Sequence, residues 1–379
     1  MDRLQAIVRI LPRAGDCLTG GASLAHILRG EARWIGSKSS MLKAILFRLG
    51  GAVPVLIMVT CGIFALIHLA PGDAATLLAP DEAGPAEVAR LRAMWGLDQP
   101  LLVQLWRFLV NAAQFNFGNS LRYQQPVIDL IAARLPATLE LALVTLTIAT
   151  AIGVPMGMAA ALNKGKWIDG VVSFISIAGV SAPSFWIGIL LVLFFSAELH
   201  LLPSGSRLPY GTPLDPGTGL FLLDSLLQGR FDTMRLVALH LALPAITLAL
   251  GMVGIIARIT RSAIVDVGQE DFIYTAVAKG LTRRAIVRRH LLPNSAIPIS
   301  TIIGLELGVL ISGTIIAEVV FSWPGVGTLL YQAVSVRDTP LTTGVVIVYT
   351  MLFILLNVCI DLFYFIVDPR VRAAGGMKA

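Results

Sequence analysis

Charged side chains are scarce in this chain of 379 residues: only 14% of the residues are Asp, Glu, Lys or Arg, whereas 56% are hydrophobic. Soluble domains carry roughly 25% charged residues, so this chain has too little charge to cover a globular surface in water. A soluble enzyme is therefore disfavoured, and the high apolar content excludes intrinsic disorder. The composition places the chain among polytopic membrane proteins.

Several chemical motifs are missing as well. Three cysteines without a C-x-x-C pair cannot staple a fold, and the five histidines lack the H-x-x-x-H spacing of a zinc site. No G-x-x-x-x-G-K-[ST] phosphate loop is present, so energy from ATP would have to come from another subunit. We also find no nucleophile–base arrangement. We therefore expect no enzyme activity, no metal site and no cofactor on this chain.

The sequence does contain six apolar runs near the roughly 20 residues that a helix needs to cross a bilayer. These runs are rich in Leu, Ile, Val, Ala and Gly and lack the alternation of β-barrel strands. They predict an all-α polytopic membrane protein with six transmembrane helices. The predicted spans are residues 45–69, 139–161, 171–197, 237–256, 296–320 and 341–367.

The distribution of Lys and Arg predicts the orientation of these spans. Of the 29 Lys and Arg residues, 20 fall on the side that holds both chain ends, the loop around Lys164 and Lys166, and residues 258–295. Because cytoplasmic loops carry the excess of positive charge, both termini are expected in the cytoplasm. Topology and anionic lipid headgroups explain this charge, and no basic region has interleaved aromatic residues. We expect membrane lipid but no nucleic acid as a partner.

The segments outside the spans predict little further structure. Residues 1–40 lack a continuous apolar core, so they are not a cleaved signal peptide. Either they form a cytoplasmic extension or Met41 is the true start. The outer segments predict short helices at residues 85–95, 101–114 and 220–228.

The cytoplasmic segment between spans 4 and 5, residues 258–295, is too polar to span and too long for a tight turn. It predicts a short helix over residues 269–280, with acidic residues at the start, Lys279 at the end and Gly280 as a C-terminal cap. By itself this pattern favours a solvated loop helix with no special role.

The same segment resembles the permease signature of binding-protein-dependent ABC importers, which reads Glu-Ala-Ala, three residues, Gly, nine residues, Ile-x-Leu-Pro. Tyr274-Thr275-Ala276 takes the first triplet, Gly280 the glycine, and residues 290–293 (His-Leu-Leu-Pro) the end. Tyr replaces the Glu of the general signature. Residues 274–281 fit the more specific form Tyr-x-x-x-Ala-Lys-Gly-Leu, which is similar to the oligopeptide/dipeptide permease branch.

Further motifs resemble the same branch and extend the likeness over residues 41–372. They are Leu-Ala-Pro-Gly-Asp at 69–73, Arg-Leu-Pro-Ala-Thr-Leu-Glu-Leu at 134–141, Pro-Ser-Phe-Trp at 183–186, Glu-Val-Val-Phe-Ser-Trp-Pro-Gly-Val-Gly at 318–327 and Asp-Pro-Arg at 368–370. The resemblance implies an N-terminal extension at 1–40, an importer transmembrane domain at 41–372 and a cytoplasmic tail at 373–379.

The resemblance also implies a coupling helix that docks on an ATPase. The residues assigned to this contact are Tyr274, Thr275, Ala276, Ala278, Lys279, Gly280 and Leu281. Small Ala276 and Ala278 would sit deep in a partner groove, Gly280 would allow a sharp turn, and Tyr274 would anchor the interface.

The implied partners are a second homologous permease, two ATP-binding subunits that carry ATP and Mg²⁺, and an extracytoplasmic solute-binding protein. The implied location is a bacterial or archaeal cytoplasmic membrane.

Two groups of residues are candidates for the translocation path and its outer gate. Glu306 lies in mid-span, where a charge costs about 2.5–3.5 kcal/mol on insertion scales. It either faces the path, with Ser184 and Phe185, or makes a structural polar contact. Glu140 and Glu318 lie near outer span ends and are expected to cap helices or brace the gate. Trp323, Pro324 and Gly325 join Glu318 as a candidate outer gate or binding-protein contact.

The predicted function is the permease half-pathway of an ATP-driven importer for di- and oligopeptides, working by alternating access. Glutathione, nickel complexes and oligosaccharides remain alternative substrates of such importers. A self-contained secondary transporter is the alternative of a different class, but the inverted repeats with broken helices that would favour it are not visible. A membrane-embedded enzyme would need a convergent set of polar groups that the spans lack.

Overall fold

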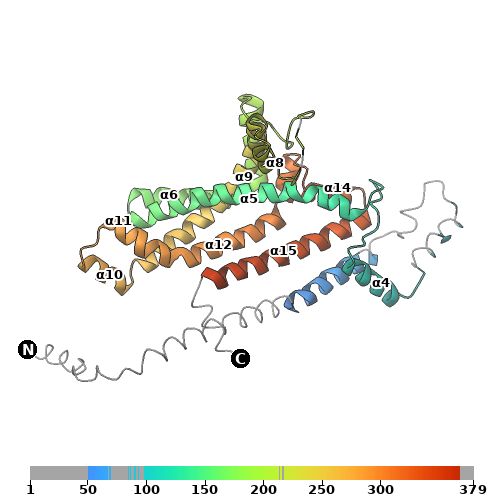
Figure 1. Ribbon diagram of the computed structural model, residues 1–379, viewed down its shortest axis with the longest axis horizontal. Coiled ribbons are helices and arrows are strands. Elements are labelled where there is room, and N and C mark those ends of the chain that lie inside the picture. Colours follow the sequence, from blue (N-terminus) through green and yellow to red (C-terminus); the bar gives the residue numbers. More distant parts are fainter. Residues whose placement is uncertain are drawn as a thin grey trace, which may run out of the picture.

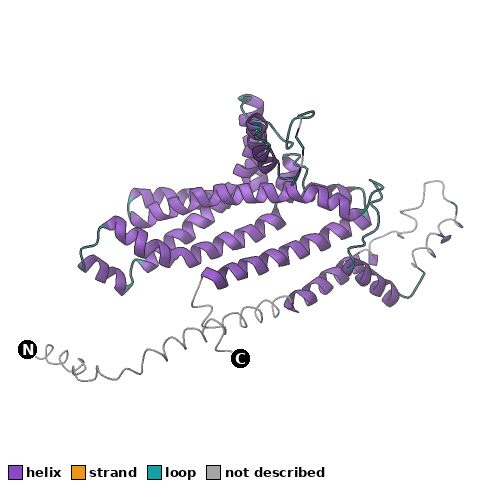
Figure 2. Cartoon of the chain, viewed as in Figure 1, coloured by secondary structure: helices purple, strands orange, loops and turns teal. Residues whose placement is uncertain are grey.

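The computed structural model describes residues 50–66, 68–69, 98–212, 214–215 and 217–367, together with residues 84, 86, 89–90 and 93. Within these residues the regular structure is helical, apart from one isolated bridge between Asn119 and Pro126 (Figure 2). The helices after Gly50–Leu66 are α4 (Leu101–Ala113), α5 (Val127–Leu162), α6 (Trp167–Ser181), α7 (Ser184–Leu191), the π-helical η2 (Val192–Glu198), α8 (Phe221–Leu227), α9 (Phe231–Val267), α10 (Asp271–Ala278), α11 (Arg283–Ile286), the π-helical η3 (Val287–Leu291), α12 (Leu292–Gly313), α13 (Ile315–Val320), α14 (Val326–Ser335) and α15 (Thr339–Val367).

Four helical stretches are long and apolar enough to cross a membrane. They are Val127–Leu162, Phe231–Val267, Arg283–Leu310 and Thr339–Ile360, and they contain or overlap predicted spans 2, 4, 5 and 6. The bent pair α6 and α7–η2 adds a fifth if it counts as one span. The described part of the first predicted span is the shorter apolar helix Gly50–Leu66. The mostly helical membrane fold is thus confirmed, while six complete spans stay a prediction.

The third predicted span, residues 171–197, is not one straight helix. The chain bends by 98° between Trp167–Ser181 and Ser184–Glu198. Ala182 adopts an extended backbone conformation (φ −86°, ψ 131°) just before Pro183. Proline disfavours the helical conformation of the residue that precedes it, so the helix ends there and restarts in a new direction. The sequence did not predict this bend, because hydropathy is high on both sides of the break, and a single span over residues 171–197 stays a prediction.

The long helices pack side by side, with α6 alongside α5 and with α12 beside α15 (Figure 1). Glycines let α5 and α9 approach closely: a Cβ on Gly157 would overlap the backbone of Ala257, and one on Gly153 would lie 2.9 Å from Ile256 Cγ2. These two glycines therefore allow the close contact between α5 and α9.

The short predicted helices have mixed outcomes. Helices at residues 101–114 and 220–228 are confirmed by α4 and α8. The helix expected at 85–95 falls mainly outside the described residues, as do residues 1–40 and 373–379. Helix α10 lies at one end of the bundle and α14 at the opposite end (Figure 1).

Candidate functional site

A short helix lies where the permease signature predicts one. Helix α10 ends at Ala278, and Gly280 follows with φ +75°, a backbone conformation that favours glycine. The N–H of Gly280 donates to Val277 O (2.9 Å), and the N–H of Leu281 donates to Ala276 O (3.2 Å). These two bonds form a Schellman motif, which satisfies the last carbonyls of the helix and turns the chain back towards the bundle.

Helix α10 has one buried face and one exposed face. Ile273 and Ala276, three residues apart, are 7% and 4% exposed and pack with Ile264, Ile286 and Leu291. The expectation that Ala276 enters a partner's groove does not fit this packing, because its side chain faces this chain's own core. Its spacing of three from Ile273 places both on one helix face.

The exposed face of α10 contains most of the predicted contact residues. Tyr274 is 63% exposed, and Thr275, Ala278, Lys279 and Gly280 are exposed as well, whereas Leu281 is half-buried. Sequence reasoning missed two apolar residues of this surface, Val277 (58% exposed) and Phe272 (41% exposed). A helical projection that places Ile273 and Ala276 inside would have found them.

The segment after α10 is fastened to the end of α5. The guanidinium of Arg283 donates to the carbonyl oxygen of Leu162 at 2.6 Å. The side chain of Thr282 caps α11 by accepting a hydrogen bond from the N–H of Ala285. Helix α10 is therefore held between its own apolar cluster and a polar tie to a long helix.

The path candidates Ser184 and Phe185 lie directly after the bend, at the start of α7. Both are exposed, Phe185 by 46%. Large exposed apolar residues continue on α6, where Phe174 is 73% and Ile177 57% exposed. The side formed by α6 and α7 is therefore an open apolar face of this chain.

Glu306 lies elsewhere. It is 6% exposed and sits on α12, four residues before Leu310, which belongs to the apolar cluster of α5, α9 and α12. Residues four apart share one face of a helix, so the Glu306 carboxyl points into the bundle rather than onto the open face. The structure therefore does not bring Glu306 together with Ser184 and Phe185.

Glu318 is fully buried at the junction of α5, α13 and α14. Its Oε1 accepts from Thr138 Oγ1 (2.7 Å) and from Thr314 Oγ1 (3.3 Å). Its Oε2 accepts from the N–H of Thr328 (3.0 Å). A Cβ on Gly325 would overlap the carboxylate, so only glycine fits at that position. A buried acidic group requires such a full set of donors.

Trp323 completes this junction. It is 0% exposed, and its indole N–H donates to the carbonyl oxygen of Ala137 at 2.9 Å. Of the four residues predicted for the outer gate or a binding-protein contact, only Pro324 is partly exposed. Buried Glu318, Trp323 and Gly325 offer no surface to a partner in this structure, and their geometry is that of an internal brace.

A second buried brace holds the segment between η2 and α8. Arg207 donates through Nε (3.0 Å) and Nη2 (2.5 Å) to Glu140 Oε2, and through Nη2 to Gly219 O (2.5 Å). Its guanidinium also lies 3.6 Å from the ring centroid of Phe221. Burial lowers the pKa of Arg207 from its usual value, and the Glu140 carboxylate opposes that shift. Sequence reasoning anticipated a bracing role for Glu140 but not Arg207, which lies 67 residues away.

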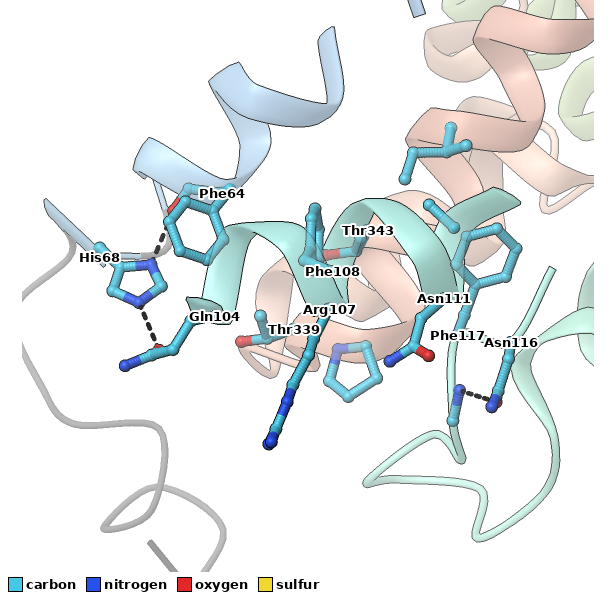
Figure 3. A pocket seen from close by; sticks show the side chains of 14 residues that line it. Phe64, His68, Gln104, Arg107, Phe108, Asn111, Asn116, Phe117, Thr339 and Thr343 are labelled. Carbon is cyan, nitrogen blue, oxygen red and sulfur yellow. Dashed lines mark hydrogen bonds between the residues drawn. The ribbon is translucent and has the colours of Figure 1, made fainter. Parts of the chain in front are cut away.

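A cavity of about 560 Å³ opens near the helix Gly50–Leu66, α4 and the start of α15. Figure 3 shows His68 beside Gln104, with Phe64 and Phe108 close by. The two nitrogens of His68 lie 2.9 Å from Phe64 O and 3.1 Å from Gln104 Oε1. None of the predicted site residues lines this cavity.

Comparison with known proteins decides the family. A family model described as the inner membrane component of binding-protein-dependent transport systems matches residues 153–373, more than half of the chain. A companion model for the N-terminal part matches residues 41–142. The chain belongs to this family. The resemblance to an importer permease, drawn from the motifs, is confirmed, and the protein is a multi-pass inner-membrane transport component rather than a membrane-embedded enzyme.

Relatives of this permease carry peptide names. The probable D,D-dipeptide transport system permease protein DdpB of Escherichia coli is 40% identical over 328 residues, which is 85% of this chain and 96% of the relative. The dipeptide transport system permease protein DppB of Alkalihalophilus pseudofirmus is 36% identical over 332 residues, which is 88% of this chain and 100% of the relative. A solved inward-facing structure of the MetNI methionine ABC transporter contains a chain of which 97% aligns with 64% of this protein, at 19% sequence identity and a TM-score of 0.49. No functional conclusion is based on a structural similarity this low.

Proposed function

We propose that this permease forms half of the translocation pathway of an ATP-driven importer for di- and oligopeptides. The observation that carries the proposal is the match to the family over nearly the whole chain, together with relatives named for dipeptides and D,D-dipeptides. Glutathione, nickel complexes and oligosaccharides are the alternative substrates that the experiment below distinguishes.

The other subunits of the proposed importer supply what this chain lacks. A second homologous permease forms the other half of the pathway, two ATP-binding subunits hold ATP and Mg²⁺, and a solute-binding protein delivers substrate from outside. This chain contributes six spans with both termini in the cytoplasm. Transport proceeds by alternating access, in which ATP binding shifts the population towards an outward-open state.

The exposed face of α10 is the proposed contact with the ATPase. Tyr274, Val277 and Phe272 supply apolar area, and Thr275, Ala278 and Lys279 surround it. Gly280 and Leu281 return the chain to the bundle, and Ala276 holds the helix from inside. A rigid helix with a packed inner face transmits a push better than a free loop does.

The path and the outer gate use separate parts of the chain. The exposed positions of Ser184 and Phe185 after the bend support a place for them along the path or beside the second permease. The buried position of Glu306 supports the structural alternative for this residue. Glu318, Trp323 and Gly325 are proposed to brace the outer end from within, and Pro324 is the member that reaches the surface.

The proposal is tested by purifying the tagged chain in mild detergent from its native membrane and identifying what accompanies it by mass spectrometry. We expect a second permease and ATP-binding subunits. In reconstituted complex, binding protein loaded with dipeptides should stimulate ATP hydrolysis. If binding protein loaded with glutathione, a nickel complex or an oligosaccharide stimulates hydrolysis instead, that compound would be the substrate in place of dipeptides. Transport by this chain alone without ATP would favour a secondary transporter and overturn the proposal.

A further inference from the structure

Helices α6 and α9 are joined by an ion pair at the end of the bundle that holds α10. Asp169, in the first turn of α6, accepts from Arg261 on α9 through Nε (2.5 Å) and Nη2 (2.8 Å). Asp169 also accepts from the N–H of Gly165 at 3.0 Å, which fixes the loop between α5 and α6. Two parallel bonds from a planar guanidinium specify orientation as well as distance.

The two helices then touch backbone to backbone further along. A Cβ on Gly254 of α9 would lie 2.5 Å from Ser176 O, and a Cβ on Gly179 of α6 would lie 2.8 Å from Leu250 O. The pairs 169 with 261, 176 with 254, and 179 with 250 keep one antiparallel register. At 1.5 Å per residue, this contact extends about 15 Å along α6.

Each end of this joined pair leads to a proposed functional part. Helix α9 runs unbroken to Val267, and only three residues separate it from α10. Helix α6 ends at Ala182–Pro183, where the chain turns by 98° towards Ser184 and Phe185. A displacement of α10 therefore reaches α9 directly, and the joined helices place the bend at the far end of the same unit.

The glycine contacts and the ion pair contribute differently to the joined pair of helices α6 and α9. The contacts at Gly179 and Gly254 bring the backbones close but specify register only through van der Waals packing, which is not directional. The bidentate pair is directional and lies nearest to α10. It therefore specifies the orientation of α9 against α6 more closely than the glycine contacts do.

We propose that Asp169 and Arg261 are positioning residues that make α6 follow α9 when the ATPase moves α10, so that ATP hydrolysis is converted into movement at the Ala182–Pro183 bend. This inference rests on the proposed function. Neither residue touches substrate in this account. Without the pair, the ATPase would still cycle, but part of its motion would be lost between α9 and α6.

The test uses the complete complex in proteoliposomes and measures dipeptide uptake per ATP hydrolysed. Asp169→Asn removes the charge and keeps the size. Because mutations in coupling elements typically change coupling by factors of two to thirty, we expect uptake per ATP to fall about fivefold while ATP hydrolysis continues. The exchange Asp169→Arg with Arg261→Asp should recover part of that ratio, since Arg at position 169 cannot accept from Gly165. Asp266→Asn is the matched control: Asp266 is an exposed acidic residue on α9, the helix of Arg261, and its substitution should leave the ratio unchanged.

Each remaining outcome rejects the inference. An unchanged ratio in Asp169→Asn would show that the pair does not transmit motion. Loss of complex assembly in both the single variant and the exchange would make the pair a folding element only. A ratio that the exchange does not raise would place the effect outside the pair. If the unmodified complex shows no ATPase stimulation by loaded binding protein, the proposed function fails first, independently of these variants.

Discussion

At the scale of single residues, the role of each acidic side chain in this permease follows from the hydrogen-bond donors around it rather than from its place in the sequence. Glu318, Glu140 and Asp169 each meet donors from other elements, and each joins two or more helices or loops. Glu306 has no ion-pair partner within the described part of the chain. The three partnered carboxylates are therefore structural ties, placed at opposite ends of the bundle.

Glu318→Gln should destabilise the protein although the two side chains have nearly the same shape. The amide nitrogen of Gln would face a hydroxyl or an N–H that now donates to the carboxylate. An unsatisfied buried donor costs about 1–3 kcal/mol. The melting temperature of the purified complex in detergent checks this. Glu198→Gln, at an exposed position, should leave the melting temperature unchanged. An equal effect in both variants would contradict the stabilising role of the donors around Glu318.

At the scale of elements, the packing of this protein depends on the close approach of helices at glycines. A Gly→Ala substitution should therefore have different effects on stability at a packed glycine and at an open one. Gly157→Ala inserts a methyl group against Ala257 and, at 2.7 Å, against Thr260 Cβ, so we expect lower stability and yield. Gly170→Ala, in α6, meets open space and should be neutral or stabilising by about 0.5–1 kcal/mol. Thermal unfolding of the two variants in detergent distinguishes the sites, and equal changes would contradict the packing.

A second prediction at this scale concerns helix α10. Substitutions on its exposed face should weaken the contact with the ATP-binding subunits, whereas substitutions on its buried face should lower the stability of the permease. Tyr274→Ala removes an exposed aromatic, so the ATP-binding subunits should co-purify poorly while the permease keeps its melting temperature. An interface anchor is worth about 2 kcal/mol or more, which is roughly thirtyfold in affinity. Ala276→Leu overfills the inner cluster and should lower the melting temperature itself. Normal co-purification of Tyr274→Ala would remove this face from the contact.

At the scale of the whole molecule, orientation is open to a direct labelling experiment. Lys166 is exposed in the loop between α5 and α6, and Tyr210 is fully accessible in the segment between η2 and α8. The predicted topology places these two segments on opposite sides of the membrane. With the three native cysteines replaced, Tyr210→Cys should react with an impermeant maleimide in intact spheroplasts. Lys166→Cys should react only after lysis, because positive loops stay in the cytoplasm. The reverse pattern would invert the topology.

Much of this molecule follows from its sequence, for identifiable physical reasons. Long helices and α10 were predictable because an apolar run and a C-terminal glycine act locally. The bend at Ala182–Pro183 was missed because hydropathy does not register direction. The pairs Arg207–Glu140 and Arg261–Asp169 join residues 67 and 92 positions apart, so only the folded chain reveals them. Ala276 was placed on the wrong face because the signature marks residue types but not their orientation.

The bend has a consequence for how cells make this protein. The arm formed by α7 and η2 meets the rest of the chain where Gly188 packs on Phe321 and Thr247, and it leaves Trp186, Leu193 and Phe194 about half exposed. Among the described residues, none covers these side chains, which leaves them to lipid or to another subunit. If the proposed complex forms, a copy made in excess of the other subunits would keep this apolar surface uncovered by protein, and we expect it to be degraded faster than an assembled copy. Production of all subunits in matched amounts, as from adjacent reading frames, would avoid such unassembled copies.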